Sequence, residues 1–551
     1  MNFFKLLIKN ALIVNGKNEP PFRGSVLVKD GRIDRIIPGY ASDEDIRSLN
    51  INPDDTRIEE AEGAYLTPGF IDIHRHGDWK ALMGADGGDD ELLNRQGLTT
   101  VVNGNCGLSV MPCGTKYADQ IRRFLSPVTG SKPAINAAKD ADRDLASYFD
   151  ALKSVPRTVN SGMLAGNGTI RASAAGYHPG ALTGEEIRLI RREIEKALED
   201  GALGVSLGLG YAPEFEYNAA GLIEVLEPLR GTSVPLTTHI RSEGDGSYES
   251  IEEVIRVSES LGVPLHISHM KCIGRRNWHT GPERTLDLLH RKNSEGMTID
   301  YDLYPYKTGS TQLLHVIPPS FQTGGADAFM AGLRVRSFRD ALTDALKTPA
   351  HDFENIVELV GFENIYASTL RSEAFRAFSG QSIAAIADAL EADPYETLYD
   401  VLAAENCDVT MLDTIASDDD MTVFYRDPLS SVISDAIYPD GGRLHPRVYA
   451  SFPLFLIRWV RETGLLAIEE AIHKMTAKPA SVLKIDRGVI EEGAAADLCL
   501  FRLEDLTAPA TFEEPEQLCG GFRLVTVGGR IVVDNDVWQP ESAGCGRIIR
   551  R

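Results

Sequence analysis

Short apolar runs recur along the middle of the chain, and several of them end in a polar or ionisable residue. Eight such runs have the length and the β-branched content of buried strands, and they cover residues 69–73, 99–103, 160–165, 204–207, 235–238, 265–268, 297–303 and 432–434. Helical patterns, such as those over 184–199 and 248–261, lie between them. This alternation predicts an α/β fold, a parallel (β/α)₈ TIM-like barrel with its active site at the carboxyl ends of the strands.

The two ends of the chain show short apolar runs joined by turn residues instead. Dipeptides such as Asp30-Gly31, which separates two of these runs, are typical of turns between antiparallel strands. We therefore predict that residues 1–66 and 484–551 form one small β-sandwich domain beside a barrel of residues 67–483. A helical stretch before the last barrel strand is too long for a barrel connection, which predicts an inserted helical subdomain or lid over 320–428.

Composition limits the classes of partner. The chain has 551 residues, 43% of them hydrophobic, and a formal net charge of -24 at pH 7. This negative charge disfavours phosphate backbones and anionic lipids, so neither nucleic acid nor a membrane is expected as a partner. The run Leu6-Leu7-Ile8 is too short for a signal peptide, and no later run approaches the roughly 18 apolar residues of a membrane-spanning helix. We predict a cytoplasmic protein, with homo-oligomerisation left open.

A histidine pair provides the strongest local signal. In Pro68-Gly69-Phe70-Ile71-Asp72-Ile73-His74-Arg75-His76, two histidines follow the first predicted strand. Side chains two apart on a strand point to the same face, so His74 and His76 are expected to converge at the barrel mouth. Two imidazoles there can bind one divalent ion. The alternative is a pair that occurs by chance at a strand end.

Two further histidines stand at the ends of later predicted strands. His239 ends the run Val234-Pro235-Leu236-Thr237-Thr238-His239, and His269 ends Pro264-Leu265-His266-Ile267-Ser268-His269. A barrel gathers its catalytic groups from the ends of separate strands, so both imidazoles are candidate ligands of the same metal centre. His266 lies three residues earlier on the opposite side of the pleat and is interpreted as a hydrogen-bonded packing residue.

One cysteine occupies a comparable position. The seven cysteines are an odd number scattered over a long chain and do not form a disulfide framework. Cys106, in Asn103-Gly104-Asn105-Cys106-Gly107, directly follows the second predicted strand. A thiolate there can ligate or bridge metal ions, whereas the usual fate of a free cysteine is burial as a small hydrophobic residue. The strand-end position favours the ligand.

A carboxylate is also needed beside the metal. Asp435 follows the last apolar run, Ser431-Val432-Ile433-Ser434, at the strand end where a general base is expected. It would take a proton from the attacking water and deliver it to the leaving nitrogen of an amide. The acidic run Asp418-Asp419-Asp420 is the rival, but its flanking sequence indicates a solvated helix start.

With these residues placed, the chain resembles the amidohydrolase superfamily and, within it, the N-acyl-D-amino-acid deacylases or D-aminoacylases. The resemblance covers nearly the whole length, from the Pro-Gly-Phe-Ile-Asp-x-His-x-His segment through Asn-Cys-Gly to the paired β-module. Carbamylated-lysine relatives have a lysine at the end of the fourth strand, whereas this chain has Gly204-Val205-Ser206-Leu207-Gly208. In the deacylase subgroup a cysteine after the second strand has the bridging role, which matches Cys106.

The resemblance implies a function for each candidate. One metal site would consist of His74, His76 and Asp435, and the other of Cys106, His239 and His269. The mixed imidazole, thiolate and carboxylate set favours zinc, as one or two ions. The α-carboxylate of the substrate would be held by Tyr304, Ser310 and Arg447, since a guanidinium fork suits a carboxylate and hydroxyls orient it. These three residues alternatively pack at the barrel rim.

We therefore predict a metal-dependent hydrolase that splits the amide bond of N-acyl-D-amino acids into a carboxylate and a free D-amino acid. The basic residues Lys271, Arg275 and Arg276 follow the sixth strand, where they either meet an acidic side chain, as in N-acyl-D-glutamate or N-acyl-D-aspartate, or are ordinary exposed residues. Cyclic amides, as in dihydroorotases and hydantoinases, or dipeptides remain alternatives on the same metal site. A non-enzymatic scaffold is disfavoured because all six candidate ligands are present. Ala436 stands where family members usually have glycine, which leaves the side-chain preference open.

Overall fold

A barrel of parallel strands forms the centre of the molecule. The computed structural model describes residues 5–41, 56–141, 143–348 and 353–551. The barrel strands are β6 (Phe70–Asp72), β7 (Leu98–Asn103), β8 (Asn160–Met163) with β9 (Ala165–Gly166), β10 (Val205–Gly208), β11 (Leu236–His239), β12 (Leu265–Ile267), β13 (Ile299–Leu303) and β18 (Ser430–Val432). Each lies within two residues of a predicted strand, which confirms the barrel.

Hydrogen bonds close these strands into a ring. One parallel sheet has the order β18-β13-β12-β11-β10-β9 and a second has the order β6-β7-β8. Leu164 alone separates β8 from β9, so the two sheets are continuous there. At the opposite seam, the N–H of Asp435 donates to the carbonyl of His74 at 2.9 Å, and the N–H of His76 donates to Ala436 at 2.8 Å. The seam therefore joins the segments that carry three of the candidate ligands.

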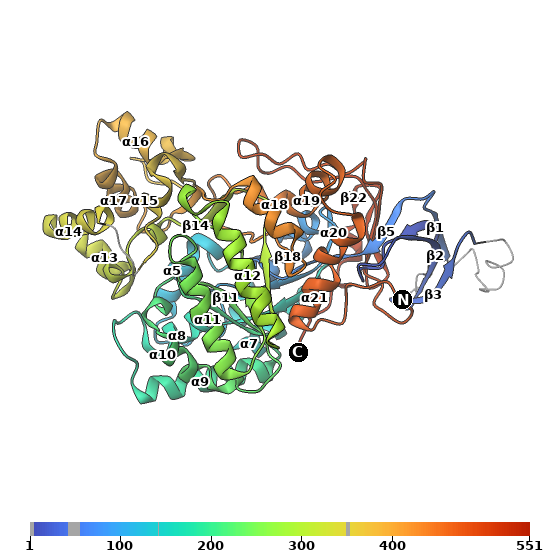
Figure 1. The fold of residues 1–551 in the computed structure, drawn as a ribbon, viewed down its shortest axis with the longest axis horizontal. Helices are drawn as coiled ribbons and strands as arrows, with labels where there is room; N and C mark the ends of the chain where they lie inside the picture. Colours follow the sequence, from blue (N-terminus) through green and yellow to red (C-terminus); the bar gives the residue numbers. More distant parts are fainter. Residues whose placement is uncertain (1–4, 42–55, 142, 349–352) are drawn as a thin grey trace.

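Amphipathic helices cover the outside of the barrel (Figure 1). They include α5 (Ala118–Thr129), α7 (Leu145–Lys153), α8 (Asn167–Ala175), α9 (Gly184–Asp200), α10 (Ala219–Val225), α11 (Ser247–Leu261), α12 (Thr280–Ser294), α18 (Asp418–Arg426), α19 (Arg447–Phe455), α20 (Ile468–Met475) and α21 (Ala477–Leu483). In α9 a capping box of Thr183 and Glu186 satisfies the first N–H groups, and the helix stops at Gly201, whose φ is 108°. Its buried stripe of Ile190, Ile194 and Ala197 packs against the barrel.

Segments from both halves of the chain meet in one β-module at one end of the molecule, whereas the last residues return to the barrel, where the N–H of Ile549 donates to the carbonyl of Ser161 at 2.9 Å (Figure 1). The nine strands of the module are β1 (Lys5–Ile13), β2 (Phe22–Lys29), β3 (Arg32–Pro38), β4 (Thr56–Glu60), β5 (Tyr65–Pro68), β19 (Leu498–Phe501), β20 (Phe522–Val527), β21 (Arg530–Asp534) and β22 (Val537–Trp538). Strand β5 pairs antiparallel with β19, so the two halves of the chain share a single hydrogen-bonded sheet. β5 then leads through Gly69 into β6, where the side chain of Thr99 leaves no room for a Cβ.

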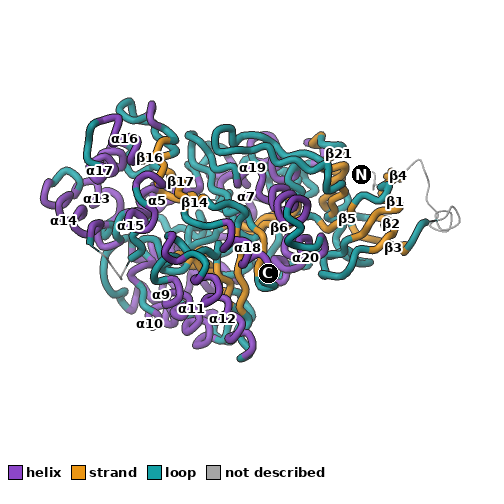
Figure 2. Tube along the Cα trace, turned by 45° about the horizontal axis from the view of Figure 1, so that its top comes forward, coloured by secondary structure: helices purple, strands orange, loops and turns teal. Residues whose placement is uncertain are grey.

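The segment between β13 and β18 projects from the other end of the molecule (Figures 1 and 2). Its helices are α13 (Gly325–Gly332), α14 (Arg336–Lys347), α15 (Ile356–Val360), α16 (Ile383–Leu390) and α17 (Pro394–Ala404). It also holds a four-stranded sheet of β14 (Thr308–Gln312), β17 (Thr410–Thr414), β15 (Ile365–Ala367) and β16 (Gln381–Ser382). The sequence pattern did not predict this sheet, because two of its strands span only two or three residues, too few to show an alternation.

The acidic run Asp418-Asp419-Asp420 forms the first turn of α18, capped by the Ser417 side chain. This position agrees with its interpretation as a helix start, since acidic residues in a first turn face the positive end of the helix dipole. Among the described residues no helix is long and apolar enough to cross a membrane.

Candidate metal centre and substrate cavity

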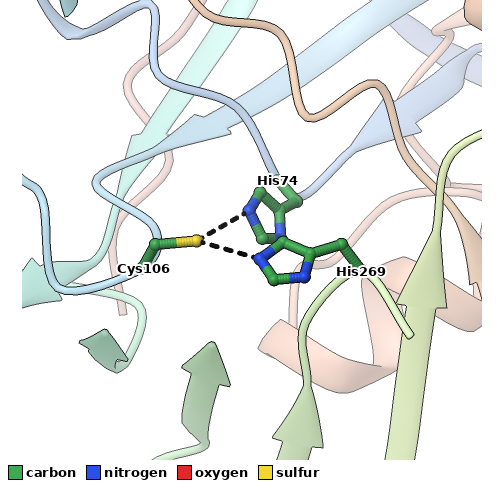
Figure 3. Close-up of side chains that lie close together, drawn as sticks. All are labelled: His74, Cys106 and His269. Carbon is green, nitrogen blue, oxygen red and sulfur yellow. Dashed lines mark hydrogen bonds between the residues drawn. The ribbon is translucent and has the colours of Figure 1, made fainter. Parts of the chain in front are cut away.

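The six candidate ligands come from five strand ends and converge at the barrel mouth. His74 and His76 follow β6, Cys106 follows β7, His239 ends β11, His269 follows β12 and Asp435 follows β18, and all six are buried. Figure 3 shows the sulfur of Cys106 directed between two imidazoles. Its Sγ lies 3.2 Å from Nε2 of His74 and 3.4 Å from Nε2 of His269. The thiol therefore stands between the two predicted halves of the centre.

The remaining ligands complete each half. The Nε2 atoms of His74 and His76 lie 3.4 and 3.5 Å from Oδ1 of Asp435. On the other side, Nδ1 of His239 lies 2.9 Å from Nε2 of His269. The structure thus brings together every residue that the sequence placed in the metal sites, at separations that one or two ions can span.

The backbone at three of these residues is in the left-handed region, which non-glycine residues rarely adopt. The φ angles are 53° at Cys106, 38° at His269 and 49° at Asp435. Gly107, with a φ of 69°, has no room for a Cβ because the buried carboxylate of Glu214 lies against it. Such conformations cost free energy and cluster at functional sites, where they direct side chains into the cavity.

Charges in the centre favour the ionised forms of the thiol and the carboxylate, which are the forms that bind metal. Burial opposes ionisation of the Cys106 thiol, but positive charge on His74 and His269 outweighs burial and holds its pKa well below the usual value. Burial likewise opposes the Asp435 carboxylate, whereas Arg447 and the imidazoles hold its pKa well below the usual range. A thiolate, a carboxylate and imidazoles form a donor set that binds divalent ions. Nδ1 of His76 is buried with no hydrogen-bond partner among the described residues.

Two carboxylates that the sequence analysis did not assign fix the imidazoles from behind. Oε1 of Glu243 lies 2.8 Å from Nδ1 of His269, which leaves Nε2 directed at Cys106. Oδ2 of Asp302 lies 3.3 Å from Nδ1 of His74 and 2.9 Å from Nε2 of His266. Such partners set the tautomer and orientation of metal-binding histidines. Sequence reasoning could have found Asp302, because it is a charged residue inside an apolar strand. It could not have found Glu243, which lies in a loop without a recognisable pattern.

The three candidate substrate residues lie together beside Asp435. Nη1 of Arg447 is 3.0 Å from Oδ2 of Asp435, and its Nη2 donates to the carbonyl of Ser310 at 2.9 Å. The Arg447 guanidinium also stands 4.7 Å above the ring centroid of Tyr304. Arg447 is fully buried, and its Nε has no hydrogen-bond partner among the described residues. The Ser310 hydroxyl donates to the carbonyl of Met411 at 2.9 Å, so it has to rotate to reach a ligand.

One cavity reaches from Tyr304 and Ser310 to the metal centre. It is lined by Tyr211, His239, Glu243, His269, Lys271, Tyr304, Gly309, Ser310, Thr311, His315, Asp413 and Asp435, among others. Lys271 binds Glu243 at 2.6 Å inside the cavity. Arg276, in contrast, is exposed and paired with Asp245 and Glu358, and Arg275 is exposed as well. Of the three basic residues suggested for an acidic side chain, only Lys271 therefore lines this cavity.

Asp413 enters the cavity from β17 of the insert, where no sequence pattern pointed to a site residue. Burial raises the pKa of its carboxyl to about 7, although Lys271 and Arg447 act in the opposite direction. Its position against Gly309, near the Tyr304 hydroxyl, depends on the antiparallel pairing of β14 with β17. The insert thus supplies part of the wall of the cavity.

Comparison with known proteins adds to this geometry. A model of the amidohydrolase family matches residues 57–296 and 441–533. The chain is 30% identical to an N-acyl-D-glutamate deacylase of Alcaligenes xylosoxydans xylosoxydans, over 99% of this chain and 96% of the relative. An N-acyl-D-aspartate deacylase of the same organism is 29% identical over 98% of this chain and 93% of the relative. The solved N-acyl-D-glutamate deacylase from Bordetella bronchiseptica, complexed with zinc and a phosphonate mimic of the tetrahedral intermediate, is 28% identical with a TM-score of 0.80 over 100% of both chains.

Proposed function

Because the chain belongs to the amidohydrolase family, we propose that it hydrolyses the amide bond of N-acyl-D-amino acids, releasing a carboxylate and the free D-amino acid. The observation that carries the proposal is the fully buried guanidinium of Arg447, 3.0 Å from the carboxylate of Asp435 at the metal centre. A group that binds a carboxylate thereby stands beside the groups that hydrolyse an amide. The two similar deacylases that are named for N-acyl-D-amino acids support the same substrate class.

The residues present fit zinc, as one or two ions. His74, His76 and Asp435 would hold one ion, and Cys106, His239 and His269 would hold the other. Zinc, when bound, polarises the amide carbonyl and lowers the pKa of water. The low pKa of the Cys106 thiol supports its role as a shared ligand, because a thiolate is the form that binds metal.

Asp435 is proposed to move the proton. Its carboxylate lies 3.0 Å from Arg447 and is held ionised, so it can accept a proton from the attacking water. The protonated carboxyl then donates to the amide nitrogen as the C–N bond breaks, which restores the carboxylate. Arg447 keeps Asp435 directed into the cavity between these two transfers.

Arg447, Tyr304 and Ser310 are proposed to hold the α-carboxylate. Tyr304 and Ser310 line the cavity and supply hydroxyl donors, the latter once it rotates, and the guanidinium of Arg447, with its unpartnered Nε, packs on the Tyr304 ring. The α-carboxylate of the substrate would be fixed on one side and its amide carbonyl at the metals on the other. The side chain and the hydrogen of the α-carbon then have to occupy the two remaining positions. This three-point geometry supports discrimination between D and L substrates.

An acidic side chain, as in N-acyl-D-glutamate or N-acyl-D-aspartate, is the finer proposal. It is supported by the similar deacylases named for these substrates and by the ammonium group of Lys271 in the cavity. A cytoplasmic location and a small-molecule substrate as partner complete the proposal. The seven cysteines support that location, because no disulfide joins any of them in the described structure.

The test is release of free amine from paired D and L panels of N-acetyl amino acids, with zinc-loaded and chelated protein. We expect turnover of the D series alone, lost on chelation and restored by zinc, with the acidic members fastest. Equal turnover of the L series would contradict the stereochemical part. Turnover of cyclic amides or dipeptides in place of both series would contradict the substrate class.

A further inference from the structure

One carboxylate of the insert reaches a loop of the barrel. Glu354, just before α15, is 7% exposed, and its Oε1 accepts the backbone N–H of Glu243 at 2.8 Å and the Ser242 hydroxyl at 3.3 Å. The next residue of the loop, Gly244, has no room for a Cβ, which would lie 2.7 Å from Leu359 of α15 and 2.9 Å from the same oxygen. The insert therefore packs closely on the loop that follows β11.

That loop contains Glu243, whose carboxylate contacts a candidate ligand of the metal centre. Oε1 of Glu243 contacts Nδ1 of His269 at 2.8 Å and Nζ of Lys271 at 2.6 Å. The carbonyl of Glu243 accepts the N–H of Ile273 at 2.8 Å, so both backbone polar groups of Glu243 are hydrogen-bonded. The N–H side depends entirely on Glu354, because no other acceptor for it is found among the described residues.

A second contact between the insert and the barrel lies near the first but does not reach the metal centre. Glu358 of α15 pairs with Arg276 at 2.9 Å, and Arg276 also pairs with Asp245. This contact is partly exposed, with side-chain exposures of 51% for Arg276 and 35% for Glu358, and none of its groups contacts a candidate ligand. Exposed ion pairs of this kind contribute little to stability. Glu358 is therefore a matched control for Glu354, four residues away.

We propose that Glu354 is a positioning residue of the metal centre, which acts from the insert through Glu243 on His269 and Lys271. The insert thereby helps to order the centre as well as lining part of its cavity. Without the Glu354 acceptor, the Glu243 peptide turns away, its carboxylate leaves Nδ1 of His269, and the imidazole loses its fixed direction toward Cys106. This inference rests on the metal centre of the proposed function and extends it to a residue that touches neither metal nor substrate.

The experiment measures zinc affinity by competition with a chromophoric chelator, and zinc content by atomic emission, for four forms of the full chain. These are the wild type, Glu354→Ala, Glu354→Gln and Glu358→Ala. We expect Glu354→Ala to bind zinc about tenfold more weakly, the lower end of the effect that partners of metal-binding histidines have. Glu354→Gln keeps an amide oxygen in place of Oε1 and should match the wild type, as should Glu358→Ala. Burial, together with the nearby negative charge of Glu243, raises the pKa of Glu354 to about 8, so a neutral glutamine is close to the state present at pH 7.

Two further measurements separate positioning from folding. Thermal melting of metal-free Glu354→Ala should show one cooperative transition, lowered by no more than about 3 °C, because a lost buried acceptor costs about 1–3 kcal/mol and 1 kcal/mol shifts the melting temperature of a chain this long by about 1 °C. If Glu354→Ala fails to fold, Glu354→Asp carries the test, because its shorter side chain cannot reach the N–H of Glu243 and should weaken zinc binding. If Glu354→Ala binds zinc as tightly as Glu358→Ala, the inference is wrong but the proposed function stands. The same holds for Glu354→Asp where Glu354→Ala does not fold. A wild-type protein that bound no zinc would overturn the proposed function as well.

Discussion

Arg447 offers the sharpest test of how the substrate is recognised, because it has two separable tasks. Its Nη1 lies 3.0 Å from Asp435, its Nη2 donates to the carbonyl of Ser310, and its Nε, which has no partner among the described residues, is left for the proposed α-carboxylate. Arg447→Met removes both the charge and the fork, whereas Arg447→Lys retains the charge alone. Truncating one partner of a buried, hydrogen-bonded charge pair costs about 2–5 kcal/mol, which corresponds to a loss of about 30-fold to 5,000-fold in kcat/KM.

The assay compares an N-acetyl-D-amino acid with its α-amide, which has the same side chain but no carboxylate. For the amide, Arg447→Met reports only the loosening of Asp435, so the extra loss on the acid measures carboxylate recognition. We expect the acid to lose at least about 30-fold more than the amide in Arg447→Met, and an intermediate amount in Arg447→Lys. Equal losses for acid and amide would refute the assignment of Arg447 to the α-carboxylate and leave it only the role of holding Asp435.

The other predictions concern the metal centre and the cavity wall. Asp435→Asn should lower kcat by about 10²–10⁴, the usual effect of losing a general acid–base, with a KM that changes far less in steady-state assays. Cys106→Ser should abolish the cadmium–thiolate absorption band of the cadmium-substituted protein, and persistence of that band would assign it to another cysteine. Burial raises the pKa of Asp413 to about 7, above its unfolded value of about 4, so in the metal-free protein this carboxyl destabilises the fold increasingly as pH rises between these values. Asp413→Asn should therefore raise the melting temperature more at pH 7 than at pH 4, and a pH-independent difference would contradict the burial of this group.

The barrel and the positions of the candidate ligands were predictable because both depend on local periodicity. A buried strand is an apolar run, and the residue that ends the run lies at the mouth of a parallel barrel. This reasoning placed His74, Cys106, His269 and Asp435 at strand ends, and the structure brings them together around one point. Their roles as ligands stay predictions until a metal is bound.

The residues behind and above the centre were not predictable in the same way. Glu243 lies in a loop whose course depends on the insert, and Asp413 reaches the cavity only through the pairing of β17 with β14. For Arg276, in contrast, the sequence position suggested a contact with the substrate. In the structure it pairs with the surface carboxylates of Asp245 and Glu358 instead. Long-range packing decides the position of such side chains, and a single sequence has no local pattern that encodes it.

The most direct test of the account is a crystal structure of the zinc-loaded protein with a phosphonate analogue of an N-acyl-D-amino acid. We expect zinc on the six ligands around Cys106, phosphonate oxygens on the zinc and on Asp435, and the α-carboxylate within hydrogen-bond distance of Arg447, Tyr304 and Ser310. Zinc bound elsewhere, or an analogue whose carboxylate lies away from Arg447, would contradict it.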